Sequence, residues 1–225
     1  MTTTAVQATE ERIPLTRERI VDAALRYIDD HGLNALSTHK LGAELGVKGM
    51  SLYNHVASKD DLLDGVVELL FSEVESAAPT RDDWREGFRL FAHALRDVVR
   101  RHPNAAPLIT SQHVIPVPAL RVVQAHIAAA TNGGTPEAQA YALLRTITWY
   151  ALGSALVEVS WGFAGPGCAP VVSDLLRPGV PHELVGVAEV YCGQSNPDAE
   201  FVLGLDLMLR GTESSHPSSP AETSQ

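Results

Sequence analysis

The sequence predicts an all-α protein with a small N-terminal unit of three helices and a larger helical C-terminal domain. Apolar residues recur every three or four positions along most of the chain, which is the spacing of amphipathic helices. The alternating pattern of β-strands is weak throughout. Residues 37–63 carry helix, glycine turn and helix, the helix-turn-helix pattern. We expect these parts at 1–14 (disordered arm), 15–60 (helix-turn-helix domain), 61–212 (helical domain) and 213–225 (disordered tail).

The first helix should run from a cap at Thr16 to about His31, where Gly32 ends it. A threonine hydroxyl can accept a hydrogen bond from a free N–H of the first turn. Four apolar positions form the stripe that should face the other two helices of the unit: Ile20, Ala24, Tyr27 and Ile28.

The helix-turn-helix pattern begins with a short helix from about Thr38 to Leu45, capped by Ser37 or Thr38. Gly46 follows its last periodic residue, where glycine suits the left-handed conformation found after helix ends. Ala43 is small, and we expect the second helix to cross closely at this position.

The second helix should cover about Gly49 to His55, with Leu52 and Val56 turned inward. Ser58 should cap the third, longer helix, with Asp61 in the place of the acidic residue of a capping box. Further helices are expected at about 59–78, 84–102, 119–131, 136–159, 182–192 and 198–211, with Gly- and Pro-rich segments at 103–118 and 162–181.

Charge is unevenly distributed along the chain. The 225 residues carry a net charge of −10, which argues against a protein that coats nucleic acid nonspecifically. Residues 12–59 hold seven Lys and Arg against five Asp and Glu, a sum of +2, so the remainder sums to −12. A mildly basic head on an acidic body fits local contact with phosphate at one end.

The sequence favours a cytoplasmic protein that does not bind membranes. The first ten residues lack the basic and apolar regions of a signal peptide. The most apolar stretch, 147–157, is too short to span a membrane, and Glu158 closes it. Two cysteines, Cys168 and Cys192, do not form a dense framework, so free thiols are expected.

Motifs for metal binding and catalysis are missing from the sequence. The histidines show no HExxH or comparable short ligand spacing, and neither cysteine has a CxxC partner. There is no Gly-rich phosphate loop and no GxSxG, and Gly165-Pro166-Gly167 is interpreted as a turn. We therefore expect no metal, no cofactor and no enzymatic activity.

A longer motif makes the helix-turn-helix pattern specific. Leu45-Gly46-Val47, Ser51-Leu52-Tyr53, His55-Val56, Lys59 and Leu62-Leu63 resemble the DNA-binding signature of the TetR family of bacterial repressors. The resemblance implies phosphate contacts from Tyr53 and Lys59. The start of the helix at Thr38 should contact phosphate as well, because a helix N-terminus attracts it. Exposed residues of the next helix should contact base edges, because Asn can pair with adenine and Lys with guanine. The candidate DNA-binding residues are Thr38, His39, Lys48, Gly49, Met50, Ser51, Tyr53, Asn54, His55 and Lys59. The alternative is a solvated helix face with one core tyrosine.

The C-terminal domain resembles the tetracycline-repressor subgroup. The end of the chain resembles the last helix of this subgroup at Phe201, Gly204, Leu205, Leu207 and Gly211. The segment Ala151-Leu152-Gly153 also resembles the subgroup. The resemblance implies that the helices at 136–159 and 198–211 form a four-helix interface in a homodimer.

The effector pocket departs from that subgroup. Its histidine, asparagine, histidine and glutamate around a drug–magnesium complex align with Glu75, Phe91, Ile109 and Val157. We therefore expect a metal-free, apolar or aromatic effector. Its candidate lining is Phe88, Phe91, Leu95, Ile109, His113, Trp149, Gly153 and Trp161. The alternative is that these side chains are ordinary core.

Three hypotheses follow from these patterns. The first is a homodimeric repressor that binds a palindromic DNA operator and is released by a small molecule. The second is an architectural or activating DNA-binding regulator whose C-terminal domain only dimerises. The third is a small-molecule-binding protein that has lost DNA binding.

Overall fold

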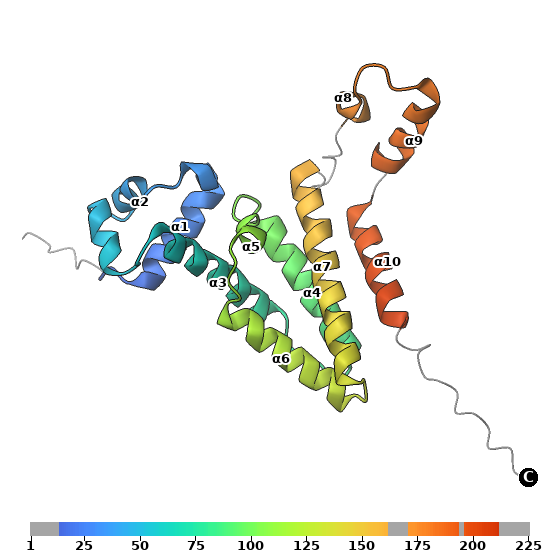
Figure 1. Ribbon diagram of the computed structural model, residues 1–225, viewed down its shortest axis with the longest axis horizontal. Helices are drawn as coiled ribbons and strands as arrows, with labels where there is room; N and C mark the ends of the chain where they lie inside the picture. The colour runs from blue at the N-terminus through green and yellow to red at the C-terminus, as the bar shows by residue number, and fades with distance from the viewer. Residues whose placement is uncertain (1–13, 162–170, 194–195, 212–225) are drawn as a thin grey trace, which may run out of the picture. The chain divides into compact units, whose positions relative to one another are not determined.

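The computed structural model describes residues 14–161, 171–193 and 196–211, and these residues are helical without any β-strand. The all-α prediction is confirmed (Figure 1). The expected arm and tail, the Gly165-Pro166-Gly167 turn and Cys168 lie largely or wholly outside the described residues. The helices are α1 (Arg17–His31), η1 (Leu33–Ala35), α2 (Thr38–Glu44), η2 (Gly49–Asn54), α3 (Lys59–Ala77), α4 (Trp84–Arg101), α5 (Leu108–Ser111), α6 (Val117–Asn132), α7 (Glu137–Trp161), α8 (Val172–Leu175), α9 (His182–Gly193) and α10 (Pro197–Arg210).

The chain divides into two compact units, residues 1–66 and 67–225, and each has its own core. In the first unit α1 starts as predicted, because the Thr16 hydroxyl accepts a hydrogen bond from the Arg19 N–H. Ile20, Ala24 and Ile28 are fully buried along one stripe of α1. Burial of an isoleucine side chain contributes about 1.5–3 kcal/mol, so this stripe holds the small unit together.

A Schellman motif ends α2. The Gly46 N–H donates to the Ala43 carbonyl at 3.1 Å, and the Val47 N–H donates to the Gly42 carbonyl at 2.8 Å. Gly46 has φ +69°, the left-handed conformation that the sequence predicts there. Ser37 caps the other end by accepting from the Lys40 N–H. Both predicted ends of α2 are thus confirmed.

The close crossing occurs at Gly42, and the prediction of Ala43 is wrong. Ala43 is exposed. A Cβ at Gly42 would lie only 2.7 Å from the Gly49 nitrogen and 2.9 Å from the Val47 carbonyl oxygen. The second helix of the helix-turn-helix, expected at Gly49 to His55, is the 3₁₀ helix η2, which ends at Asn54. The six-residue segment fits this tighter helix, which proteins use in short pieces.

The start of α3 carries the predicted capping box in a shifted form. The Ser58 hydroxyl accepts from the Asp61 N–H at 3.0 Å. The Asp61 carboxylate reaches back to the Ala57 N–H at 2.7 Å and also pairs with Arg17 of α1 at 2.6 Å. The Ala57 N–H and then the Arg17 guanidinium hold the pKa of Asp61 below its usual range. This junction fixes the first turn of α3 against α1.

In the second unit α7 packs against α4, α6 and α10 (Figure 1). Its buried stripe includes Ala140, Leu144 and Ile147. This agrees with the expected burial of the helix against several partners. Its opposite side is exposed and apolar, however, with Trp149 66% and Trp161 51% exposed.

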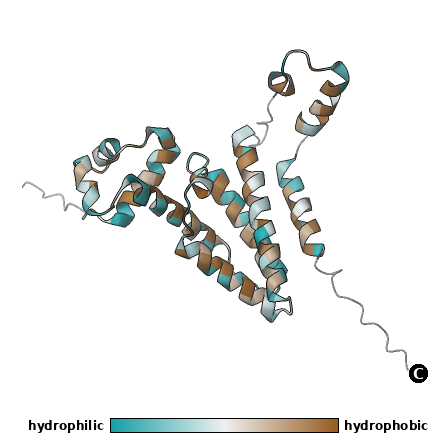
Figure 2. Cartoon of the chain, in the orientation of Figure 1, coloured by the Kyte–Doolittle hydropathy of each residue, from teal (hydrophilic) through white to brown (hydrophobic). Residues whose placement is uncertain are grey.

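The packing of α10 on α7 depends on one glycine. Tyr150 of α7 stacks on Phe201 of α10 at 5.2 Å between ring centroids. Its hydroxyl donates to the carbonyls of Glu200 and Phe201 at 3.1 and 3.2 Å. A Cβ at Gly204 would overlap the Tyr150 ring, so any other residue there must displace that ring. Leu205 is buried in the chain's own core, whereas Leu203 and Leu207 are exposed. Hydrophobic and hydrophilic residues are interspersed along α7 and α10 (Figure 2).

Candidate functional site: the helix-turn-helix surface and the C-terminal pockets

The exposed side of η2 gathers the predicted DNA-binding residues of the first unit. Met50 is 76% and Tyr53 41% exposed, although both are large and hydrophobic. Leu52 and Val56 are buried and anchor η2 in the core, as predicted. Of the other candidates, His39, Lys48, Asn54, His55 and Lys59 are exposed and Thr38, Gly49 and Ser51 are half-buried.

Two lysines meet at the N-terminal end of α2. The Lys59 ammonium donates to the Leu36 carbonyl at 3.3 Å, and the Lys40 ammonium donates to the neighbouring Ala35 carbonyl at 3.2 Å. Each ammonium keeps further N–H groups for another acceptor. The sequence prediction did not include Lys40 among the DNA-binding candidates. Its place in the first turn of an exposed helix was the one signal that could have suggested a phosphate contact. The two ammonium groups thus bind neighbouring carbonyls just before the start of α2.

The eight residues predicted to line a ligand pocket do not gather at one place. Phe88, Phe91 and Leu95 of α4 are buried in the core. Ile109 packs against a small core cluster, and His113 is exposed. The remaining three, Trp149, Gly153 and Trp161, line one cavity.

That cavity lies between α7, α9 and α10 and has a volume of about 990 Å³. We call it the α7–α10 cavity. Its walls are mainly aromatic and apolar, with two carboxylates and no Lys or Arg among the described lining residues. They comprise Trp149, Tyr150, Gly153, Ser154, Val157, Glu158, Trp161, Val190, Tyr191, Cys192, Pro197, Glu200 and Phe201.

A buried ion pair lies behind this cavity. Arg96 of α4 is 3% exposed, and its Nε donates to Glu158 of α7 at 2.9 Å. Asp198 at the start of α10 pairs with Arg96 at 2.8 Å and with Arg100 at 2.9 Å. Arg96, followed by Arg100, lowers the pKa of Asp198. Arg96 also lies 4.6 Å above the Phe201 ring. The ion pairs with Asp198 hold both arginines within this network.

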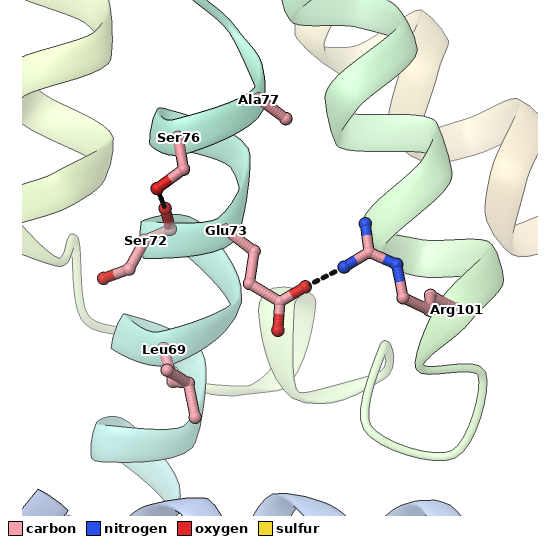
Figure 3. Close-up of a pocket in the computed structure, with 6 residues that line it drawn as sticks. All are labelled: Leu69, Ser72, Glu73, Ser76, Ala77 and Arg101. Carbon is pink, nitrogen blue, oxygen red and sulfur yellow. Dashed lines mark hydrogen bonds and ion pairs between the residues drawn. The ribbon is translucent and has the colours of Figure 1, made fainter.

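A second, smaller pocket of about 460 Å³ lies between α3 and α4 (Figure 3). Arg101 and Glu73 form an ion pair across it. His102 lies 3.3 Å from the same carboxylate. The Ser72 and Ser76 hydroxyls donate to carbonyls of their own helix. None of the eight predicted ligand residues lines this pocket.

The aligned drug–magnesium positions do not fit a metal-bound drug. The Glu75 carboxylate accepts two hydrogen bonds from Arg121, at 2.6 and 2.8 Å, which lower its pKa. Phe91 is 3% exposed and offers no ligand atom. The described residues hold no cluster of His, Cys, Asp or Glu that could bind a metal ion. In the same ranges, no helix is long and apolar enough to cross a membrane.

Comparison with known proteins matches both units. Residues 20–66 match the family model "Bacterial regulatory proteins, tetR family", and residues 76–215 match "Tetracyclin repressor-like, C-terminal domain". An HTH-type transcriptional regulator of Saccharopolyspora erythraea is 33% identical over 147 residues, 65% of this chain but only 62% of that protein. The tetracycline repressor protein class A from transposon 1721 of Escherichia coli is 28% identical over 202 residues, 85% of this chain and 88% of the repressor. The crystal structure of the Streptomyces coelicolor TetR family protein ActR in complex with actinorhodin has a TM-score of 0.73 and 27% identity, covering 91% of this chain and all of that chain.

Proposed function

The chain belongs to the TetR family of transcriptional regulators, and on this premise we propose that it is a repressor that binds a palindromic operator as a homodimer. An apolar or aromatic small molecule, without a metal, releases it. The family consists of regulators, which confirms that the chain is not an enzyme. The observation that carries the proposal is the exposed side of η2, locked onto α2 at Gly42.

Some of the exposed side chains would contact DNA phosphates, and others would contact base edges. Lys59, Lys40 and Tyr53 supply contacts to phosphate, since ammonium and hydroxyl groups donate to its oxygens. Met50 and Asn54 of η2, and Lys48 just before it, are exposed and would reach base edges in the major groove. Palindrome recognition needs two such heads about one DNA turn apart, roughly 34–36 Å.

The experiment for DNA binding starts from selection of duplexes that bind the protein. Selected sequences should share a palindrome. Lys59→Ala should weaken binding to all duplexes and lower the salt slope by about one contact. Asn54→Ala should instead change the preference at one base pair in each half-site. Arg26→Ala, which removes an exposed charge of α1 outside the candidate interface, is the matched control. Equal affinities of Lys59→Ala and the native protein at every salt concentration would refute the phosphate contact.

The homodimer is supported by exposed apolar side chains of α7 and α10 that lie outside the lining of the α7–α10 cavity, at Tyr141, Val202, Leu203 and Leu207. We call these four residues the dimer face. Large apolar side chains at such density are costly in water and typical of an interface. A four-helix arrangement of α7 and α10 with a second copy would cover them. Light scattering at micromolar concentration should therefore give twice the monomer mass.

Release of DNA by an effector is proposed through α3, which begins with the DNA contact Lys59 and continues into the C-terminal unit. A hundredfold loss of operator affinity needs about 2.7 kcal/mol of coupling, within the usual allosteric range. Coupling is reciprocal, so the operator must weaken effector binding by the same factor.

Gly153→Trp tests the effector site. A Cβ at Gly153 meets nothing within 4 Å, and Gly153 lines the α7–α10 cavity, so the indole should project into that cavity. The variant should lose the effector response and keep operator binding. The close packing of Phe88, Phe91 and Leu95 favours a second candidate, in which the C-terminal unit only dimerises. Equal effector affinity with and without operator would support that candidate.

A further inference from the structure

We propose that Arg17 and Asp61 are positioning residues for DNA binding, which hold the first turn of α3 so that Lys59 meets a phosphate. Neither side chain of the pair touches DNA itself. This inference rests on the proposed function, because it assigns a role at the same interface to two residues outside the phosphate and base-edge contacts. The pair joins α1 to the turn of α3 that carries Lys59.

The Asp61 carboxylate joins three segments of the chain at the start of α3. Its Oδ1 accepts from the Nη2 of Arg17 at 2.6 Å, and its Oδ2 accepts from the Ala57 N–H at 2.7 Å. The same Nη2 also donates to the Asp61 carbonyl at 3.3 Å, so Arg17 holds both the side chain and the backbone of this residue. The Ser58 hydroxyl caps the same turn. The first turn of α3 is therefore tied to α1 as well as to the residues that precede it.

The place of the Arg17 guanidinium beside α3 depends on Gly65, one turn further along the helix. A Cβ at Gly65 would lie 3.1 Å from the Nη1 of Arg17 and 2.8 Å from the Cγ2 of Val21. Ordinary contact begins at 3.4 Å, so a larger residue there must displace these side chains. The missing side chain of Gly65 thus leaves the room in which Arg17 reaches Asp61.

The two ends of the Lys59 side chain are held by different parts of the first unit. Its backbone belongs to the turn that Arg17 and Asp61 fix, and its ammonium donates to the Leu36 carbonyl at 3.3 Å. Leu36 is 4% exposed and belongs to the core just before α2. A lysine side chain that is free loses rotamer entropy when it binds phosphate, whereas one that is already held loses less. The pair therefore raises DNA affinity by preorganisation of Lys59.

The alternative is that Arg17 is itself a phosphate contact, because it is a basic residue at the start of α1. A carboxylate at 2.6 Å already neutralises its guanidinium, and a paired charge attracts a phosphate only weakly. The two side chains are 38% and 32% exposed, and ion pairs at such exposure contribute little to folding stability. An effect of the pair on DNA affinity can thus be separated from an effect on folding.

Two neighbouring carboxylates with opposite expected effects test this inference. Asp61→Asn removes a negative charge near the DNA, so electrostatics alone predicts tighter binding to a selected duplex. Loss of the pair predicts weaker binding instead, by about fivefold, with the salt slope lowered by about one contact. Asparagine keeps an acceptor for the Ala57 N–H, so the cap should persist. Asp60→Asn, the matched control, removes an exposed charge from the same turn and should strengthen binding by up to about twofold.

The Lys59→Ala background separates positioning from direct contact. Without Lys59 the pair has no contact to position, so Asp61→Asn should cause no further loss of affinity. Arg17→Gln should weaken binding about fivefold in the native protein, but at most about twofold, the effect of one lost charge, in the Lys59→Ala background. Fivefold losses from Arg17→Gln in both backgrounds would make Arg17 a direct contact and overturn the positioning role.

Three other results decide between the remaining explanations. Unchanged or tighter duplex binding by Asp61→Asn would refute the positioning role. Hydrogen exchange of peptides from 17–66 should stay at the native rate in Asp61→Asn outside the first turn of α3; faster exchange throughout, in proportion to the lost affinity, would show a pair that serves folding alone. Absence of duplex binding by the native protein would instead refute the proposed function.

Discussion

Replacement of Gly42 by alanine should push α2 and η2 apart and so distort the helix-turn-helix. The added Cβ would lie 2.7 and 2.8 Å from the nitrogen and Cα of Gly49 and 2.9 Å from the Val47 carbonyl oxygen. All three atoms belong to the backbone, so no side-chain rotation can relieve the overlap. Ordinary contact begins at 3.4 Å, and α2 and η2 must therefore move apart.

The expected destabilisation follows from two opposing effects. Alanine in place of glycine within a helix contributes about 1 kcal/mol of stability. Overpacking costs about 1–3 kcal/mol, and a rigid backbone neighbour places Gly42→Ala at the upper end of that range. The net loss should be about 2 kcal/mol. Because η2 carries Met50, Tyr53 and Asn54, its displacement should also lower operator affinity at least tenfold.

Hydrogen exchange of peptides from 17–66 measures the stability of the first unit, and fluorescence anisotropy with a selected duplex measures affinity. Gly153→Ala is the matched control, because its Cβ meets nothing within 4 Å. That variant should keep operator affinity and gain up to about 1 kcal/mol. If Gly42→Ala exchanges as slowly as the native protein and binds the duplex equally well, the close crossing does not exist in solution.

Three further variants probe the second unit. Leu207→Glu should give monomers in light scattering, because Leu207 is exposed on the dimer face; Leu205 is core, so Leu205→Glu should instead unfold the unit. Gly204→Ala should lower the urea midpoint, since its Cβ would displace the Tyr150 ring by an overpacking cost of about 1–3 kcal/mol; an unchanged midpoint would refute that contact. His126 is buried and burial lowers its pKa, so the folded chain takes up this proton less readily than the unfolded chain. The contribution of the neutral His126 to folding stability is therefore complete above pH 6.5, the ordinary histidine pKa. As the pH falls below 6.5, the free energy of unfolding decreases by at most about 1.4 kcal/mol per pH unit. His126→Leu should flatten this dependence in urea unfolding between pH 5 and 8; identical slopes would show that His126 titrates normally.

Local sequence patterns were sufficient for three helix starts and one helix end in the first unit. Thr16, Ser37 and Ser58 cap helices as predicted, and Gly46 takes the left-handed conformation. Each of these features depends on hydrogen bonds between residues a few positions apart, so the residue types alone decide them. The helix-turn-helix motif could be recognised for the same reason, because its spacing is contained within residues 37–63.

Tertiary structure decided which side of each helix faces inward and which distant residues meet. Periodicity could not choose between Leu205 and Leu207, because α10 is apolar on both sides, and only packing on α7 buries the first. Arg96 and Glu158 are 62 positions apart, and their pairing follows from the packing of α4 on α7. The eight predicted ligand residues lie partly in the core, partly on the surface and partly in the α7–α10 cavity, because helix packing and not periodicity decides their neighbours. The sequence determined the helices and the family, whereas the long-range packing determined where a ligand or a second copy can bind.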